Sequence, residues 1–200
     1  ARDTRWDNNN NNTMKIIKKN IPGVYEIISE PINDNRGYLS RLLDDNIMSE
    51  FGLNAQFCQE SLQYTKKQST VRGLHVSLAP SLEGKTVTAI SGSMQWIVVD
   101  VRKESEYFGN WESVIISKEN QNTLYVERGF AHGCVSLTDD VTLLFRADNY
   151  FNADNGTGVF WGDNDLGINW KLKGKPIISD RDSNYGSFQK FKEEFGGVEV

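Results

Sequence analysis

The pattern that most constrains this chain is a succession of short β-rich segments separated by turn residues. From about residue 24 to residue 148 these segments recur roughly every ten residues, and valine, isoleucine, threonine and aromatic residues dominate them. Many short strands at this spacing predict an all-β antiparallel sandwich or barrel. The predicted strands are Val24–Ser29, Tyr38–Leu43, Phe57–Leu62, Thr70–Val76, Lys85–Ile90, Met94–Val101, Glu112–Ile116, Thr123–Val126, Gly133–Leu137 and Thr142–Arg146.

Helix signals are few. Asp45–Phe51 predicts one or two helical turns, and residues 152–169 predict a loop rich in glycine, asparagine and aspartate. Near the C-terminus, Phe188–Phe195 carries phenylalanines at helical spacing after the candidate N-cap Ser187, and Gly196 would end that helix.

Two local patterns refine the predicted strands. Gly92 lies between two of them and predicts a hairpin turn with positive φ. The run Trp96–Val99 is continuously apolar, which predicts a strand covered on both faces.

Composition narrows the class of protein. The 200 residues are 38% hydrophobic, enough for a sizeable core, and the net charge of −5 argues against a general nucleic-acid binder. The longest apolar run, Trp96–Val99, is far too short to span a membrane. Cys58 and Cys134 lie in strand-like segments and are expected to be reduced, which favours a cytoplasmic protein.

The first 13 residues differ from the rest because they contain an asparagine run and no apolar pattern. We expect residues 1–13 to be an added leader or a disordered arm, with the native start at Met14. No internal repeat or domain boundary follows, so residues 14–200 are expected to form a single domain.

The only two histidines, His75 and His132, both lie in short apolar segments flanked by glycine. Imidazole is the usual proton carrier near neutral pH. Small barrels of the cupin type often hold a metal through a His-x-His pair, but Ser77 stands two residues after His75. Because two histidines cannot form a histidine-rich metal site, we predict no metal and favour metal-free acid–base chemistry.

Three cations are candidates for binding an anionic ligand: Arg36 in a turn, Arg72 before Gly73, and Lys85 at the start of a strand. Arg72 precedes His75 by three residues. In a regular strand their side chains would point to opposite faces, unless the strand contains a bulge.

An ordered series of motifs resembles the dTDP-4-dehydrorhamnose 3,5-epimerase family and its sugar-nucleotide epimerase relatives. The resemblance runs from about Met14 to Asp182, and the ordered set is specific although no single motif is. The motifs are Val71-Arg72-Gly73-Leu74-His75, Gly84-Lys85, Val99-Asp100-Val101-Arg102, Phe108-Gly109-Asn110-Trp111, Gly129-Phe130-Ala131-His132-Gly133, Leu166-Gly167-Ile168-Asn169-Trp170 and Ile178-Ser179-Asp180-Arg181-Asp182.

The resemblance implies a cupin-like antiparallel β-barrel (jelly roll), a homodimer and no cofactor. It implies an isomerase that inverts C3, and usually C5, of a nucleoside-diphosphate 4-keto-6-deoxyhexose in deoxysugar biosynthesis. It also implies that His75 is the base, that Asp182 holds its other ring nitrogen, and that Lys85 donates to the C4 oxygen as charge builds there.

The resemblance assigns binding roles as well. Arg36, Arg72 and His132 match positions that hold the diphosphate, and Gln59 matches one that contacts the nucleotide base or the substrate nearby. Arg181 would belong to the same substrate site.

Departures from the family pattern leave two questions open, the proton donor and the nucleotide base. Phe145 stands where the family has a tyrosine thought to protonate the enolate, so Tyr150 or a water would have to replace it, or one inversion would be impaired. Arg41 and Ser61 depart in the part that reads the base, so thymine, cytosine and guanine stay open. Glu83 replaces a common glutamine.

The sequence therefore leaves alternatives beside the 3,5-epimerase. One is an epimerase that acts at C3 only on a dTDP-, CDP- or GDP-linked 4-keto sugar. The others are a 3,4-ketoisomerase and a non-catalytic sugar-nucleotide binding module. The product could serve lipopolysaccharide, capsule, another glycan or a secondary metabolite.

Overall fold

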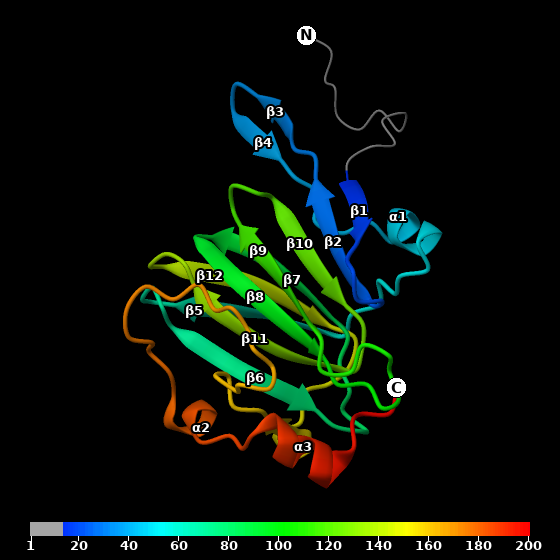
Figure 1. Ribbon diagram of the computed structural model, residues 1–200. Coiled ribbons are helices and arrows are strands. Elements are labelled where there is room, and N and C mark those ends of the chain that lie inside the picture. The colour runs from blue at the N-terminus through cyan, green and yellow to red at the C-terminus, as the bar shows by residue number, and fades with distance from the viewer. Residues whose placement is uncertain (1–13) are drawn as a thin grey trace.

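The computed structural model describes residues 14–200, whose strands form two large antiparallel sheets packed face to face and a separate two-stranded sheet, β3-β4 (Figure 1). The six-stranded sheet has the order β1-β2-β10-β7-β12-β5 and the five-stranded sheet has the order β13-β6-β11-β8-β9. The strands are β1 (Met14–Lys18), β2 (Val24–Ser29), β3 (Ile32–Asp34), β4 (Gly37–Leu39), β5 (Gln59–Thr65), β6 (Val71–Ser77), β7 (Lys85–Ser91), β8 (Ser93–Asp100), β9 (Trp111–Ser117), β10 (Asn122–Val126), β11 (Phe130–Ser136), β12 (Val141–Ala147) and β13 (Gly156–Gly158).

Four short helical segments lie among the strands. They are α1 (Asp45–Glu50), the 3-10 turn η1 (Ala153–Asn155), α2 (Asp180–Ser183) and α3 (Phe188–Phe195). The mostly-β fold class is confirmed, with one difference from a closed barrel: the two sheets remain separate. The expectation for residues 1–13 lies outside the described residues.

Hydrophobic side chains from both sheets fill the space between them. Val87 of β7 and Leu143 of β12 come from one sheet, and Trp96 and Val98 of β8 come from the other. Ile97 and Val99, which alternate with them, point to the opposite face of the five-stranded sheet and are buried there as well. The prediction that Trp96–Val99 is covered on both faces is confirmed.

The C-terminal segment covers the outer face of the five-stranded sheet. Phe188 and Phe191 of α3 pack in one cluster with Leu74 and Val99. Each fully buried phenylalanine of this kind contributes about 1.5–3 kcal/mol. The side chain of Ser187 accepts a hydrogen bond from the backbone of Lys190, and the helix ends at Phe195 before a left-handed Gly196, so the predicted caps are confirmed.

Segments with weak hydrophobic patterns were not predicted. The short strands β1, β3 and β13 and the helix α2 have three to five residues each, too few to show a period. The predicted strand Tyr38–Leu43 is shortened to the end of β4 at Leu39. Gly92 does adopt positive φ, at 71°, in the hairpin between β7 and β8.

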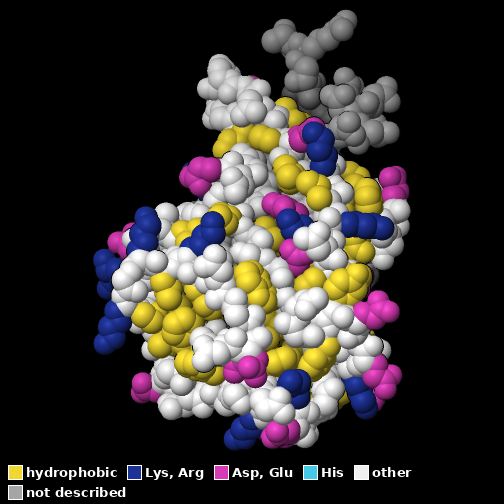
Figure 2. Space-filling model, viewed as in Figure 1, with side chains coloured by type: hydrophobic (Ala, Val, Ile, Leu, Met, Phe, Trp, Pro, Cys, Tyr) yellow, Lys and Arg dark blue, Asp and Glu magenta, His cyan; other side chains and the backbone are white. Residues whose placement is uncertain are grey.

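The outer face of the six-stranded sheet is covered over only part of its width. Met48 of α1 packs over β2 and β10. On β5 and β7, Leu62 is 69% exposed and Ile90 is 46% exposed. The hairpin β3–β4 projects from the same end of the molecule as β1 and β2, and hydrophobic side chains are visible at its base (Figures 1 and 2). Within residues 14–200, no helix is long and apolar enough to cross a membrane.

Candidate active site

His75 and Asp182 form a directly bonded pair. The Nε2 atom of His75 lies 3.0 Å from Oδ1 and 3.1 Å from Oδ2 of Asp182. A carboxylate can only accept, so Nε2 carries the proton and Nδ1 is left with its lone pair. Nδ1 has no hydrogen-bond partner among the described residues, which leaves it available as a base.

Local structure holds the carboxylate of Asp182 in place. Ser179 caps α2 and accepts a hydrogen bond from the backbone of Asp182. The backbone N–H of Gly73 donates to Oδ2 over 2.8 Å, and Nε of Arg181 donates to Oδ1 over 3.0 Å. The short α2 thus brings a residue distant in sequence against the strand that carries His75.

The electrostatics favour a neutral imidazole beside an ionised carboxylate. Burial lowers the pKa of His75, and the bond and charge of Asp182 oppose that shift, while Arg181 and Lys85 add to it. Burial by itself would raise the pKa of Asp182, but the Gly73 amide, His75 and Arg181 together hold it below its usual value. Near neutral pH the pair is therefore ready to remove a proton.

A bulge in β6 places Arg72 and His75 on the same side of the sheet. His132 of β11 pairs with His75, whereas the next residue, Gly133, pairs with Gly73, so β6 contains one extra residue. The guanidinium of Arg72 reaches across to β5 and donates to the backbone oxygen of Tyr64 over 3.1 Å. The bulge is thus present, and a regular strand would have separated the two side chains.

His132 presents an unpaired donor inside the fold. Its Nδ1 accepts a hydrogen bond of 3.1 Å from the indole N–H of Trp96, which can only donate. A neutral ring therefore carries its proton on Nε2, and that buried atom has no partner among the described residues. Burial, with the nearby charge of Lys85 and the ring of His75, lowers the pKa of His132 well below its usual value.

The six-stranded sheet supplies the opposite wall. Lys85 and Gln59 both pair with Ala147 of β12, which places them in one row across three strands. Nζ of Lys85 lies 3.1 Å from Oε2 of the buried Glu83. Phe145, two residues before Ala147, packs edge-on against Trp96 with ring centres 5.7 Å apart. This wall carries a cation and a hydrocarbon ring.

Arg36 is not brought to this site within the chain, whereas Tyr150 lies at its border, because the backbone N–H of the next residue, Phe151, donates to Oε1 of Gln59 over 2.8 Å. Arg36 lies in the projecting hairpin β3–β4, bonded to Asp34, at the end of the molecule opposite β6 and α2 (Figure 1). The side chain of Tyr150 is 65% exposed after the end of β12 and makes no hydrogen bond to the described residues. Both assignments stay predictions.

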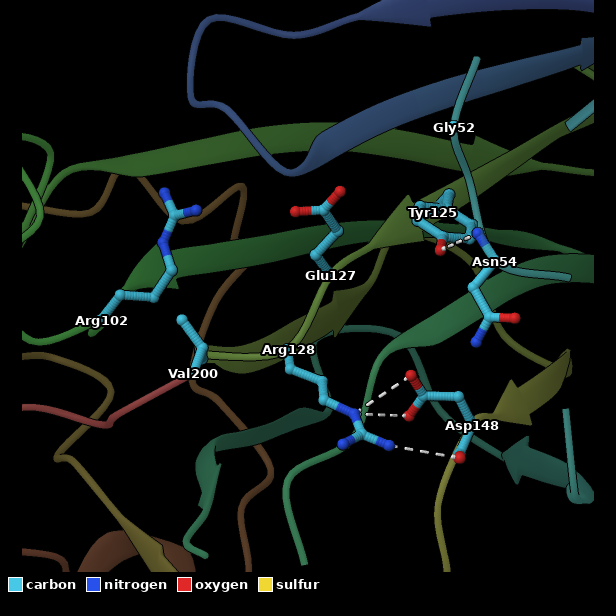
Figure 3. A pocket seen from close by; sticks show the side chains of 8 residues that line it. All are labelled: Gly52, Asn54, Arg102, Tyr125, Glu127, Arg128, Asp148 and Val200. Carbon is cyan, nitrogen blue, oxygen red and sulfur yellow. Dashed lines mark hydrogen bonds and ion pairs between the residues drawn. The ribbon is translucent and has the colours of Figure 1, made fainter. Parts of the chain in front are cut away.

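A separate hollow lies at another part of the surface (Figure 3). Its arginines are already paired, Arg128 with Asp148 and Arg102 with Asp100. It is lined by Gly52, Asn54, Arg102, Tyr125, Glu127, Arg128, Asp148 and Val200, and so contains neither His75 nor Asp182. Among residues 14–200, no three His, Cys, Asp or Glu side chains are grouped as a metal site would need.

Three residues at the site were given no role from the sequence, although Glu83 was noted as a departure from the family pattern. Trp96 orients His132, Glu83 neutralises Lys85, and the ring of Tyr185 lies edge-on to the His75 ring with centres 6.1 Å apart. Tyr185 stands three residues after Asp182, and that short spacing is the one sequence signal that could have drawn attention to it.

A two-sheet fold that holds a histidine–aspartate pair near a lysine has the groups that acid–base chemistry requires. The family model for dTDP-4-dehydrorhamnose 3,5-epimerase matches residues 18–190. The chain belongs to the dTDP-4-dehydrorhamnose 3,5-epimerase family.

Individual relatives agree with the family match. The chain is 32% identical over 176 residues to the dTDP-4-dehydrorhamnose 3,5-epimerase of Shigella flexneri, covering 88% of this chain and 96% of that protein. The structure of the Mycobacterium tuberculosis epimerase superposes with a TM-score of 0.88 at 30% identity, covering 93% and 94% of the two chains. A 3′-monoepimerase from Streptomyces bikiniensis, in complex with dTDP-quinovose, superposes with a TM-score of 0.80 at 28% identity, covering 91% of each chain.

Proposed function

We propose that this protein epimerises a nucleoside-diphosphate 4-keto-6-deoxyhexose at C3 and C5 in deoxysugar biosynthesis. The observation that carries the proposal is the arrangement of the two walls. His75 lies on one sheet, with Asp182 of α2 bonded to it, and Lys85 lies on the other sheet, close enough for its charge to act on His75. The dTDP-linked sugars in the description of the family and in the complex of the Streptomyces bikiniensis relative support dTDP as the nucleotide.

The reaction begins with removal of a proton next to the ketone. Nδ1 of His75 takes the proton from C3 or from C5, the two carbons that flank the ketone. In each case the electron pair of the broken C–H bond moves toward C4, and the C4 oxygen takes up the negative charge as an enolate. An N–H of Lys85 donates to that oxygen as its charge grows, which contributes about 3 kcal/mol in a dry site. Return of a proton to the other face of the same carbon completes the inversion.

The diphosphate is assigned to the remaining donors. The unpaired Nε2–H of His132 and the guanidinium of Arg72 suit phosphate oxygens because both present N–H groups. Arg181 lies beside Nε2 of His75 at 3.2 Å and would border the sugar. Gln59 would contact the nucleotide base or the substrate near it.

A second candidate function is epimerisation at C3 alone. Phe145 favours it, because a phenylalanine packed on Trp96 has no proton to return to the enolate. The relative from Streptomyces bikiniensis is named a 3′-monoepimerase. For inversion at both carbons, Tyr150 or a bound water would supply the proton.

Deuterium exchange separates these candidates. The protein would be incubated with dTDP-4-keto-6-deoxyglucose in deuterated water, and label at C3 and C5 would be followed by NMR. Label at both carbons supports the 3,5-epimerase, and label at C3 alone supports the second candidate. A carbonyl that has moved to C3 identifies a 3,4-ketoisomerase and contradicts both.

We also propose that the protein is a homodimer. On the partly uncovered outer face, Leu62 and Ile90 expose apolar side chains. In the hairpin β3–β4, Ile32 is 61% exposed and Leu39 is 52% exposed. A second copy covering these surfaces would bury apolar area that a monomer leaves in water. It would also allow Arg36 of the hairpin to serve the site of the partner subunit.

Sedimentation and mixing test the dimer. Leu62→Glu is expected to shift the protein from dimer to monomer in analytical ultracentrifugation, because it places a charge in the covered face. If Arg36 acts across the interface, mixing Arg36→Ala and His75→Ala subunits should restore activity that neither variant has. A monomeric parent protein contradicts the homodimer.

The cellular location and the pathway are proposed as well. Cys58 and Cys134 are free thiols, which is typical of a reducing compartment, and we propose that the protein acts in the cytoplasm. We propose that the product is used to build lipopolysaccharide or capsule. We also propose that the protein has no nucleic-acid partner. Because Arg41 and Ser61 depart from the family pattern, titration with dTDP, CDP, UDP and GDP is the direct test of the base.

A further inference from the structure

Tyr185 is a phenol beside the proposed base that the reaction as described does not use. It lies between α2 and α3, and its ring meets the His75 ring edge-on at 6.1 Å between centres, with 78° between the ring planes. The side chain is half-buried, and burial raises the pKa of its hydroxyl. It therefore stays protonated, and able to donate, throughout the neutral range.

Gly158 makes this position of Tyr185 possible. Gly158 of β13 pairs with His75 of β6, so the two residues are neighbours in adjacent strands. A Cβ on Gly158 would lie 2.4 Å from Cε2 and 2.5 Å from Cζ of Tyr185. The hydroxyl end of the ring thus occupies the space over Gly158, next to His75, that any other residue would fill with its own side chain.

Hydrogen bonds on either side fix the loop that carries Tyr185. The backbone oxygen of Gly186 accepts from Phe160 over 2.8 Å, and the carboxylate of Asp163 accepts from the backbone of Phe188 over 2.9 Å. The phenol itself makes no hydrogen bond to the described residues. A held ring with an unused hydroxyl is what a substrate contact requires, because little freedom is lost when a ligand binds.

We propose that Tyr185 is a substrate-contacting residue that recognises the sugar: its hydroxyl donates a hydrogen bond to an oxygen of the hexose beside the carbon facing His75. This inference rests on the proposed function, since it takes His75 as the group that faces the hexose. It adds a specificity element on the side of the base, where the ring also forms a wall of the site.

The test compares a ligand that has the sugar with one that lacks it. Tyr185→Phe removes only the hydroxyl, and calorimetric titration would measure the affinity of dTDP and of dTDP-glucose. We expect the affinity for dTDP-glucose to fall about three- to tenfold, the loss expected for one neutral hydrogen bond, with the affinity for dTDP unchanged. KM for the 4-keto substrate should rise by a similar factor.

Tyr25→Phe is the matched control. Tyr25 is also half-buried and meets Tyr125 edge-on at 5.9 Å, but it lies on β2, away from His75. It should leave both affinities unchanged. Equal losses for both ligands in Tyr185→Phe, or no loss for either, would overturn the role of Tyr185. If the parent protein binds dTDP-glucose no better than dTDP and exchanges no proton of the 4-keto substrate, the proposed function itself has failed.

Discussion

The two walls of the site are unequally equipped. On the five-stranded sheet, His75 is bonded to Asp182, which is in turn held by Gly73 and Arg181. On the six-stranded sheet, Lys85 is paired with Glu83. The nearby Phe145 contributes only a phenyl ring, which packs against Trp96.

This difference separates two halves of one reaction. In the proposed reaction, proton removal and charge stabilisation fall to groups that the fold already positions, the His75–Asp182 pair and Lys85. Return of a proton to the opposite face of the enolate needs a donor, and Phe145 cannot be that donor because a phenyl ring has no exchangeable proton. Packing and chemistry thus make different demands on that position, and the phenyl ring satisfies only the packing.

The largest expected effect comes from removing the base. His75→Ala should lower proton exchange at both carbons by about a thousandfold, within the range of general base catalysis. Nucleotide affinity should persist, because His75 is not assigned to the diphosphate. Exchange near the parental rate, measured by NMR in deuterated water, would refute the base assignment.

Removing the cation opposite the base should have the next largest effect. Lys85→Met should lower kcat by about a hundredfold, the usual loss for one donor to a developing oxyanion. It also leaves the buried carboxylate of Glu83 without its partner. The matched Lys85→Met, Glu83→Gln variant should regain thermal stability without regaining kcat; recovery of both would make the role of Lys85 structural.

Supplying the missing phenol should reduce the difference between the walls. Phe145→Tyr should raise deuterium incorporation at C5 about tenfold if proton return limits that inversion. Exchange at C3 serves as the internal reference in the same sample. An unchanged ratio of C5 to C3 label would show that another acid, such as Tyr150 or a water, already acts.

The smallest effect concerns the pH dependence. Because burial lowers the pKa of His75, the acidic limb of kcat/KM should lie below pH 6.5, with activity lost as His75 becomes protonated. Arg181→Gln removes a neighbouring positive charge, which should raise the pKa of His75 and move the limb to higher pH. Since the Arg181 side chain is 69% exposed, the shift should be small and should shrink in high salt. A limb that stays in place would show that Arg181 does not influence the base.

Strands with strong β-forming composition could be predicted closely. Val24–Ser29 was predicted to the residue as β2, and α3 was predicted with both caps. The helix α2 could not be predicted, because four residues show no periodicity and its stability depends on the contact of Asp182 with β6.

The site divides in the same way. His75, Asp182 and Lys85 could be named from the motifs, and the structure brings them together. The motifs gave no sign of the tautomer of His132, which depends on Trp96, or of the place of Tyr185 over Gly158. Arg36 was named from the family resemblance, but its hairpin lies at the opposite end of the molecule from β6, which carries His75 (Figure 1).

The sequence by itself determined that this chain forms antiparallel sheets, and it placed the candidate base, acid partner and lysine in recognisable segments. Only the tertiary structure decided which side chains share the interior. A single extra residue in β6 turns Arg72 to the side of His75. A glycine in β13 leaves room for Tyr185. The physical reason is that strand order, bulges and close approaches are set by packing between segments distant in sequence, which no local pattern records.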